Sequence, residues 1–154
     1  ALVPDKVIIG ILKDRLAEDD CANGFILDGV PRTIAQAEAI EKMGIRIDKV
    51  LELSVADDVI VERMSGRRVC EKCGASYHIR NKKSKVEGIC DCCGGKLVAR
   101  KDDEPATVLD RLKAYHEQTE PLVEFYRGRG KLAVIPFSPS IEETTENVMK
   151  ALEA

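Results

Sequence analysis

The chain has 154 residues, of which 44% are apolar and 33% are charged, and its formal net charge is −3. This length and composition favour one main soluble domain, and the acidic balance argues against a protein that coats nucleic acid or an anionic membrane. The sequence starts without a signal-peptide pattern and lacks the roughly 18 consecutive apolar residues of a membrane-spanning helix, so we expect a cytoplasmic location.

Three elements are expected in the first part of the chain. Pro4, followed by apolar residues at helical spacing, predicts an amphipathic helix to about residue 17. The run Gly24–Asp28, GFILD, is apolar and lies between Asn-Gly and Gly-Val-Pro, which predicts a buried strand. Thr33 and Gln36 have the spacing of a capping box and predict a helix to about residue 43.

The later elements follow the same rules of periodicity and capping and continue the alternation of strands and helices. They are a strand over 49–55, a helix over 57–65, a long helix from about Pro105 that kinks or restarts near Pro121, a strand over 131–136, and a final helix with a capping box at Ser140 and Glu143.

Strands that alternate with helices predict an α/β fold with a parallel sheet flanked by helices. Residues 66–103 break the pattern, because they are rich in Gly, Lys and Cys and lack helical or strand periodicity. We therefore expect a core α/β domain formed by residues 1–65 and 104–154, into which residues 66–103 are inserted as a small subdomain.

Two Cys-x-x-Cys pairs lie within the inserted segment. The first is Cys70 and Cys73, the second is Cys90 and Cys93, and 16 residues separate the pairs. This spacing is typical of a structural zinc site in which each short turn presents two sulfurs to one tetrahedral ion. A reversible disulfide and inert thiols are the alternatives, and Cys92 is expected to stay unliganded.

A second motif, GFILDGVPRT, places a carboxylate and a guanidinium after the predicted strand, at the end where open α/β sheets bind ligands. Asp28 suits the hydration shell of Mg²⁺, and Arg32 suits a phosphate held by two hydrogen bonds. An Asp-Gly turn with a surface arginine is the alternative. Arg63 and Arg67 stand four residues apart, so we expect a negative group beside them.

Together these residues resemble adenylate kinase of the long-lid type, whose lid is held by a zinc ion. The match includes GFILDGVPRT, the cysteine spacing with SYH, and RKDD followed by YHEQTEPL, and it extends over essentially the whole chain. The resemblance implies reversible phosphoryl transfer from ATP to AMP, giving two ADP, with Mg²⁺ bound to ATP and Zn²⁺ in the lid. It also implies a monomer that binds ATP, AMP and ADP and that binds neither nucleic acid nor a membrane.

The resemblance also implies roles for individual residues. The residues expected to contact AMP are Leu2, Val3, Gly29, Arg32, Gln36, Arg100 and Arg111. Those expected to contact ATP are Arg63, Arg67, Ser76 and Tyr77. Those expected to act on the transferring phosphates or on their Mg²⁺ are Asp28, Arg32, Arg67, Arg100 and Arg111. Gln36 has a rival explanation, because it also completes the capping box with Thr33.

The chain departs from the family pattern at three places. Val30 replaces the usual Phe, and PFSPS, residues 136–140, replaces the Asp-Gly-Thr segment near the adenine of ATP, so no residue is assigned there. The Gly-rich phosphate loop G-x-x-x-x-G-K-[ST] does not occur in the sequence. We therefore expect a fragment that lacks the first strand and this loop and that has no kinase activity alone.

Three alternative functions remain open at this point. Kinases for UMP or CMP resemble the chain around GVPR, although Thr33 and the long cysteine segment favour the adenylate type. The cysteine segment with RNKKSK, residues 80–85, could be a zinc ribbon that binds nucleic acid, against which stand the acidic total charge and the shortage of stacking aromatic residues. The last alternative is a homologue that binds AMP without catalysis.

Overall fold

The structure, a computed structural model, describes residues 3–154 and divides into two compact units. The first unit contains the residues up to Ser54 together with Ala114–Ala154, and the second contains Val55–Lys113. The second unit therefore includes a helix on each side of the cysteine segment 66–103. Over residues 3–154, no helix has both the length and the apolar character needed to cross a bilayer.

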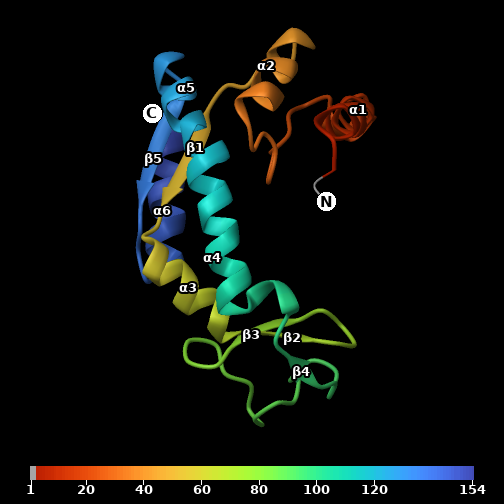
Figure 1. Cartoon of the computed structure of the whole chain (residues 1–154), viewed down its shortest axis with the longest axis vertical. Coiled ribbons are helices and arrows are strands. Elements are labelled where there is room, and N and C mark those ends of the chain that lie inside the picture. Colours follow the sequence, from red (N-terminus) through yellow and green to blue (C-terminus); the bar gives the residue numbers. More distant parts are fainter. Residues whose placement is uncertain (1–2) are drawn as a thin grey trace. The chain divides into compact units, whose positions relative to one another are not determined.

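A parallel pair of strands forms the sheet of the first unit (Figure 1). Strand β1 (Val50–Ser54) pairs with β5 (Leu132–Pro136), with Val50 opposite Leu132 and Leu53 opposite Ile135. Two parallel strands need a crossover connection, and the long segment between them supplies it. The α/β class with a parallel sheet flanked by helices is thus confirmed.

Apolar side chains from helices and strands form the core of the first unit. Helices α2 (Ile34–Lys42) and α5 (Pro121–Gly128) contribute Ala37, Leu122 and Tyr126, against which side chains of both strands pack. Helix α6 (Ile141–Glu153) packs along β5. Full burial of a large apolar side chain stabilises a fold by about 1.5–3 kcal/mol, so these contacts fix the helices to the sheet.

Both predicted helix caps form, but each capping box closes on one side only. The Thr33 hydroxyl accepts from Gln36 N–H at 3.2 Å, and the Ser140 hydroxyl accepts from Glu143 N–H at 3.2 Å. The second half of each box differs, because the Gln36 amide has other partners and the Glu143 carboxylate accepts from the Ser138 hydroxyl. These caps satisfy N–H groups that the first turn of a helix leaves unpaired.

The beginning of the described chain shows one correct and one wrong prediction. Helix α1 (Asp5–Leu16) forms as expected, and a short 3₁₀ turn follows at Asp19–Cys21. The predicted strand Gly24–Asp28 is wrong, since this segment pairs with no strand among residues 3–154. An apolar run becomes a strand only when a neighbour takes up its backbone hydrogen bonds, and Ile26 is 94% exposed.

Pro121 restarts the long helix that was predicted from Pro105. Helix α4 (Pro105–Ala114) is followed by a π-helical turn, Tyr115–Thr119, in which Glu120 N–H donates to Tyr115 O at 2.9 Å. Helix α5 begins at Pro121, whose ring nitrogen has no proton to donate to the preceding turn. The predicted restart is therefore confirmed.

A small antiparallel sheet lies within the second unit. Helix α3 (Asp57–Gly66) leads into β2 (Arg67–Cys70), which pairs with β3 (Ser76–His78) on one side and with β4 (Leu97–Val98) on the other. A 3₁₀ turn, Lys101–Asp103, then leads into α4. The sequence showed no strand periodicity here, because strands of two to four residues are too short to display it.

The junction between α3 and β2 is tightly packed around a glycine. Gly66 is buried, and an added Cβ there would lie 2.3 Å from Nε2 of the His78 imidazole. Ile79 N–H donates to Gly66 O at 2.9 Å, so the backbone of the two segments is also joined at this point.

Candidate functional site

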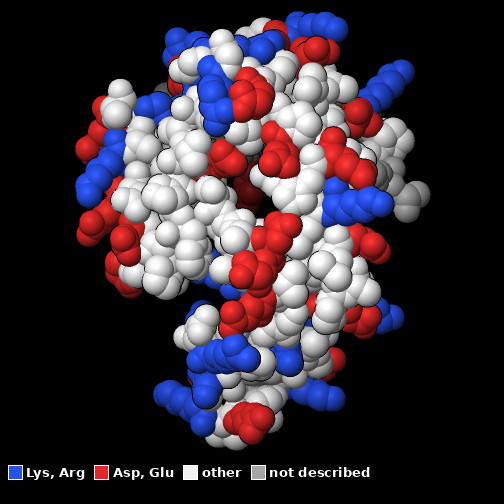
Figure 2. All heavy atoms as spheres, turned by 60° about the vertical axis from the view of Figure 1, so that its left-hand side comes forward, with Lys and Arg blue, Asp and Glu red and all other residues white. Residues whose placement is uncertain are grey.

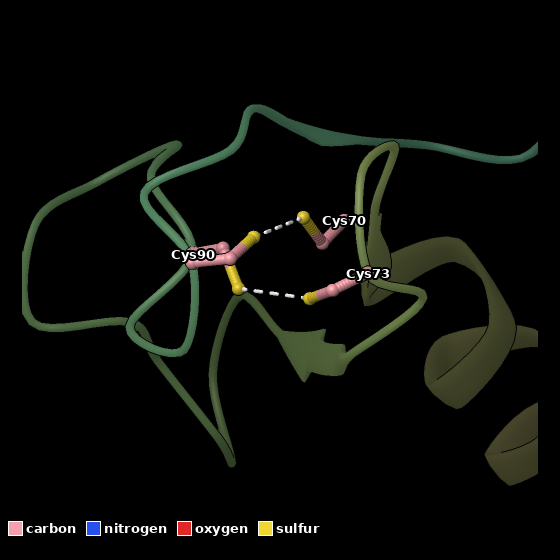
Figure 3. A group of neighbouring side chains, drawn as sticks. Cys70, Cys73 and Cys90 are labelled. Carbon is pink, nitrogen blue, oxygen red and sulfur yellow. Dashed lines mark hydrogen bonds between the residues drawn. The ribbon is translucent and has the colours of Figure 1, made fainter.

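The four predicted metal ligands converge on one point in the second unit. Cys70 Sγ lies 3.5 Å from Cys93 Sγ, and Cys73 Sγ lies 3.6 Å from Cys90 Sγ. All four sulfurs lie within 4.8 Å of one another, and Figure 3 shows the thiols of the two turns pointing toward each other. Tetrahedral coordination with metal–sulfur bonds of about 2.3 Å would place the sulfurs roughly 3.8 Å apart. The four thiols can therefore bind one metal ion.

The two cysteine turns have the same local structure. Gly74 N–H donates to Cys70 O at 3.0 Å, and Gly94 N–H donates to Cys90 O at 2.9 Å. Gly74 has φ +75° and Gly94 has φ +69°, a left-handed conformation that glycine adopts without steric cost. The glycine after each second cysteine thus allows the chain to turn back, so that both sulfurs of a turn face the same point.

A tyrosine hydroxyl and backbone N–H groups favour the thiolate form of Cys90. The Tyr77 hydroxyl lies 3.5 Å from Cys90 Sγ and accepts from Asp91 N–H at 2.9 Å. The Tyr77 hydroxyl, together with backbone N–H groups of Cys92 and Cys93, lowers the pKa of the Cys90 thiol to about 6. Metal ions bind thiolates rather than thiols, so this environment favours coordination.

The sulfurs are not joined as disulfides in the described chain, where all six cysteines have free thiols. The ring of Tyr77 is buried against these thiols, together with Leu97 and Ala75. Tyr77 was expected to line the ATP site, and its observed contacts are with the cysteine group; Ser76 beside it is exposed. No pattern in the sequence indicated the hydrogen bond between the Tyr77 hydroxyl and Cys90.

In the first unit, the loop from Gly29 to Gln36 gathers the residues expected at AMP. Gly29 has φ +81°, and its carbonyl accepts from Arg32 Nε at 2.8 Å. Arg32 N–H donates to Gln36 Oε1 at 2.7 Å, while Arg32 O accepts from the Thr119 hydroxyl at 2.7 Å. The backbone of Arg32 is therefore held through both its N–H and its carbonyl, while its side chain is exposed.

Asp28 and Val3, which are also expected near the nucleotides, belong to the same unit. Asp28 is exposed beside the loop, and Val3 is 54% exposed. Leu2 lies outside the described residues. Gln36 Nε2 donates to Asp5 Oδ1 at 2.7 Å, a contact across 31 residues that the sequence did not indicate.

The arginines of the second unit meet at the 3₁₀ turn before α4. Arg67 donates from Nε and from its second terminal nitrogen to the two oxygens of Asp103, at 2.8 and 2.5 Å. Arg100 forms an ion pair with Asp102 at 3.1 Å, and Arg111 donates to Asp102 O at 3.5 Å. These arginines come from three segments, and the exposed Arg63 lies one helical turn before Arg67.

Asp103 supplies the negative group that was expected near Arg67. Its side chain is only 2% exposed, whereas that of Arg67 is 34% exposed. The hydrogen bonds from Arg67 hold the pKa of Asp103 below its ordinary value, in spite of the opposing effect of burial. The sequence placed Asp102 and Asp103 near these arginines but did not indicate which one is buried.

Comparison with known proteins shows which protein family this chain resembles. A family model described as adenylate kinase matches residues 1–131. An adenylate kinase of Caldicellulosiruptor saccharolyticus is 55% identical over 98% of this chain and 72% of its own length, and one of Acetivibrio thermocellus is 49% identical over 98% and 71%. An adenylate kinase of Clostridium botulinum is 51% identical over 98% and 72%.

An α/β sheet, a loop that combines Asp, Gly and Arg, and an inserted cysteine group define a phosphotransferase of the nucleotide kinase class. The three relatives share about half of their aligned residues with this chain, over nearly its whole length, and all three are adenylate kinases. The chain belongs to the adenylate kinase family.

Proposed function

We propose that the loop Gly29–Gln36 binds AMP and that the arginines of the second unit bind the phosphates of ATP. The reaction is the reversible transfer of a phosphoryl group from ATP to AMP, which gives two ADP. Catalysis of this reaction depends on positioning and on neutralising phosphate charge rather than on covalent intermediates. The residues of both units fit these two requirements.

The observation that carries the proposal is the structure of the AMP loop. The bond from Arg32 Nε to Gly29 O fixes the plane of the guanidinium and leaves its terminal nitrogens as further donors for a phosphate. The loop backbone is held by Gln36 and Thr119, so little ordering is needed when the nucleotide binds. Gly29, Arg32 and Gln36 are the proposed AMP contacts, with Val3 and Leu2 beside the base.

The arginine group around Asp102 and Asp103 supports the second half of the proposal. Asp103 neutralises Arg67, and Asp102 pairs with Arg100. The arginines at positions 63, 67, 100 and 111 still exceed these two carboxylates by two positive charges. Like charges held together attract a polyanion, and a triphosphate is of suitable charge. Ser76 and Tyr77 are proposed to line the ATP site from the lid.

Metal ions are proposed to have two separate roles. Four thiolates are the donor set of a structural zinc site, so we assign Zn²⁺ to Cys70, Cys73, Cys90 and Cys93, where it holds the turns of the lid, residues 66–103, together. Adenylate kinases use Mg²⁺ with ATP, and the exposed carboxylate of Asp28 suits the water shell of that ion. We further propose a cytoplasmic monomer that does not bind nucleic acid.

The proposal is tested by ³¹P NMR of the purified chain with Mg²⁺, ATP and AMP. Because the sequence contains no Gly-rich phosphate loop, we expect the chain alone to form no ADP. The binding of AMP is therefore measured as well, by isothermal titration calorimetry, and Arg32→Ala should weaken it by a factor of about 10 to 100, because a charge-assisted contact to phosphate is lost. Arg46→Ala is the matched control, since Arg46 is 82% exposed and pairs only with the nearby Asp48. Failure of the unaltered chain to bind AMP, or equal losses of affinity in both variants, would contradict the proposed function.

A further inference from the structure

We propose that Asp5 determines specificity for the base of the nucleoside monophosphate, because it fixes the orientation of the Gln36 amide. The proposal rests on the proposed function, in which Gln36 contacts the base of AMP. Asp5 is the first residue of α1, and Gln36 lies in the first turn of α2, so the contact joins two helices at their N-terminal ends.

The two ends of the Gln36 amide have opposite partners. Its Nε2 donates to Asp5 Oδ1 at 2.7 Å, and its Oε1 accepts from Arg32 N–H at 2.7 Å. The residue is only 4% exposed. An ionised carboxylate can only accept a hydrogen bond, and a backbone N–H can only donate one. Asp5 can therefore pair only with the nitrogen of the amide, and Arg32 N–H only with its oxygen.

This arrangement prevents the amide from turning over. A rotation by 180° would place the Gln36 oxygen against the Asp5 carboxylate and the amide nitrogen against Arg32 N–H, and both contacts would be repulsive. A side-chain amide without such partners presents its donor and acceptor in either order, because the two ends have nearly the same shape. Asp5 and the Arg32 N–H together therefore fix which end of the amide lies on which side, and a change of Asp5 removes the side-chain half of this constraint.

The order of donor and acceptor distinguishes adenine from hypoxanthine and guanine. Adenine presents an amino donor beside a ring-nitrogen acceptor, whereas the other two present a carbonyl acceptor beside a ring N–H donor. One N–H and one lone pair of the Gln36 amide remain after the two protein contacts. For a base whose ribose and phosphate hold it in one position, only one amide order fits adenine, and the reverse order fits hypoxanthine.

The test compares the dissociation constants of AMP and IMP by isothermal titration calorimetry on the full chain. Asp5→Asn keeps the shape of the side chain, but its own amide can donate or accept, so it suits either orientation of Gln36. We expect the preference for AMP over IMP to fall about fivefold to tenfold in Asp5→Asn and to fall further in Asp5→Ala. Asp14→Asn, an exposed change on the same helix, should leave the preference unaltered.

Two outcomes would overturn the inference. If Asp5→Asn weakens AMP and IMP by the same factor, Asp5 has only a structural role, and the proposed function stands. If the unaltered chain does not bind AMP, the proposed function fails and the assignment of Asp5 fails with it. Thermal unfolding of each variant accompanies the titrations, and Asp5→Asn carries the test if Asp5→Ala does not fold.

Discussion

The first unit and the lid, residues 66–103, are each stabilised internally in a different way. In the first unit, Ala37, Leu122 and Tyr126 join two helices to both strands of a parallel sheet through apolar packing. In the lid, two of the three buried core side chains are cysteines, and only short strands surround them. A small segment with few apolar residues needs another source of stability, and the group of four thiols can supply it by binding a metal ion.

Charge differs between the same two regions. Residues 66–103 contain 10 Lys and Arg against 5 Asp and Glu, whereas the remaining residues contain 14 against 22. Figure 2 shows Lys and Arg side chains gathered at the lower end of the view, where Figure 1 places β2, β3 and β4. The acidic net charge of the whole chain therefore hides a basic segment at residues 66–103, and a positive charge there is compatible with the proposed contact to a triphosphate.

The largest effect is expected when the metal is removed. Structural zinc contributes apparent binding free energies of about 10–16 kcal/mol in small zinc domains, so a chelator should unfold the lid while the first unit keeps its structure. Limited proteolysis with mass spectrometry would locate the new cleavage sites, which we expect within residues 66–103.

Cysteine variants sharpen this result. Cys90→Ser should remove metal binding, measured as zinc per chain, whereas Cys92→Ser should retain it, since Cys92 is outside the group of four sulfurs. A cleavage pattern that is the same with and without chelator would show that the lid does not depend on a metal.

A smaller effect, restricted to the first unit, is expected from Leu122→Ala. Leu122 is 7% exposed and packs in the apolar core, so its truncation should lower the free energy of unfolding by about 3 kcal/mol. Urea unfolding measures this loss, and the zinc content should stay unchanged. Loss of zinc in this variant would show that the two regions depend on each other.

The smallest of these effects concerns the ion pair between Arg67 and Asp103, near the two ends of the lid. Arg67→Met leaves the buried Asp103 carboxylate without its partner and should cost about 2 kcal/mol, less than for a fully buried pair because Arg67 is one-third exposed. Asp103→Asn should cost only about 1 kcal/mol, since the remaining guanidinium is partly hydrated. Urea unfolding of both variants at pH 7 measures the difference, and a larger loss in Asp103→Asn would contradict it.

The same pair makes stability depend on pH in a defined direction. The pKa of Asp103 is lower in the folded chain than its ordinary value of 3.8, so the carboxylate form contributes stability above about pH 4. This contribution is lost as the pH falls through the folded pKa. The unaltered chain should therefore lose stability more steeply below pH 4 than Asp103→Asn, which thermal unfolding at several pH values would measure.

Local sequence rules accounted for the elements whose causes are local. Thr33 and Ser140 marked helix starts because capping depends on residues three positions apart, and the cysteine spacing marked the metal group because two short turns build it. The prediction of a strand at Gly24–Asp28 was wrong because strand formation depends on a pairing partner elsewhere in the chain. The same reason explains why Asp5 was missed as the partner of Gln36.

The packing of His78 against Gly66 restricts how the base of the lid can evolve. Because the imidazole occupies the space of a Cβ at position 66, a side chain there requires the ring to shift or to be replaced. Replacing His78 first opens that space, and a side chain at position 66 can then follow. Substitutions at these two positions should therefore be coupled: a larger residue at position 66 is tolerated better when position 78 carries a smaller side chain.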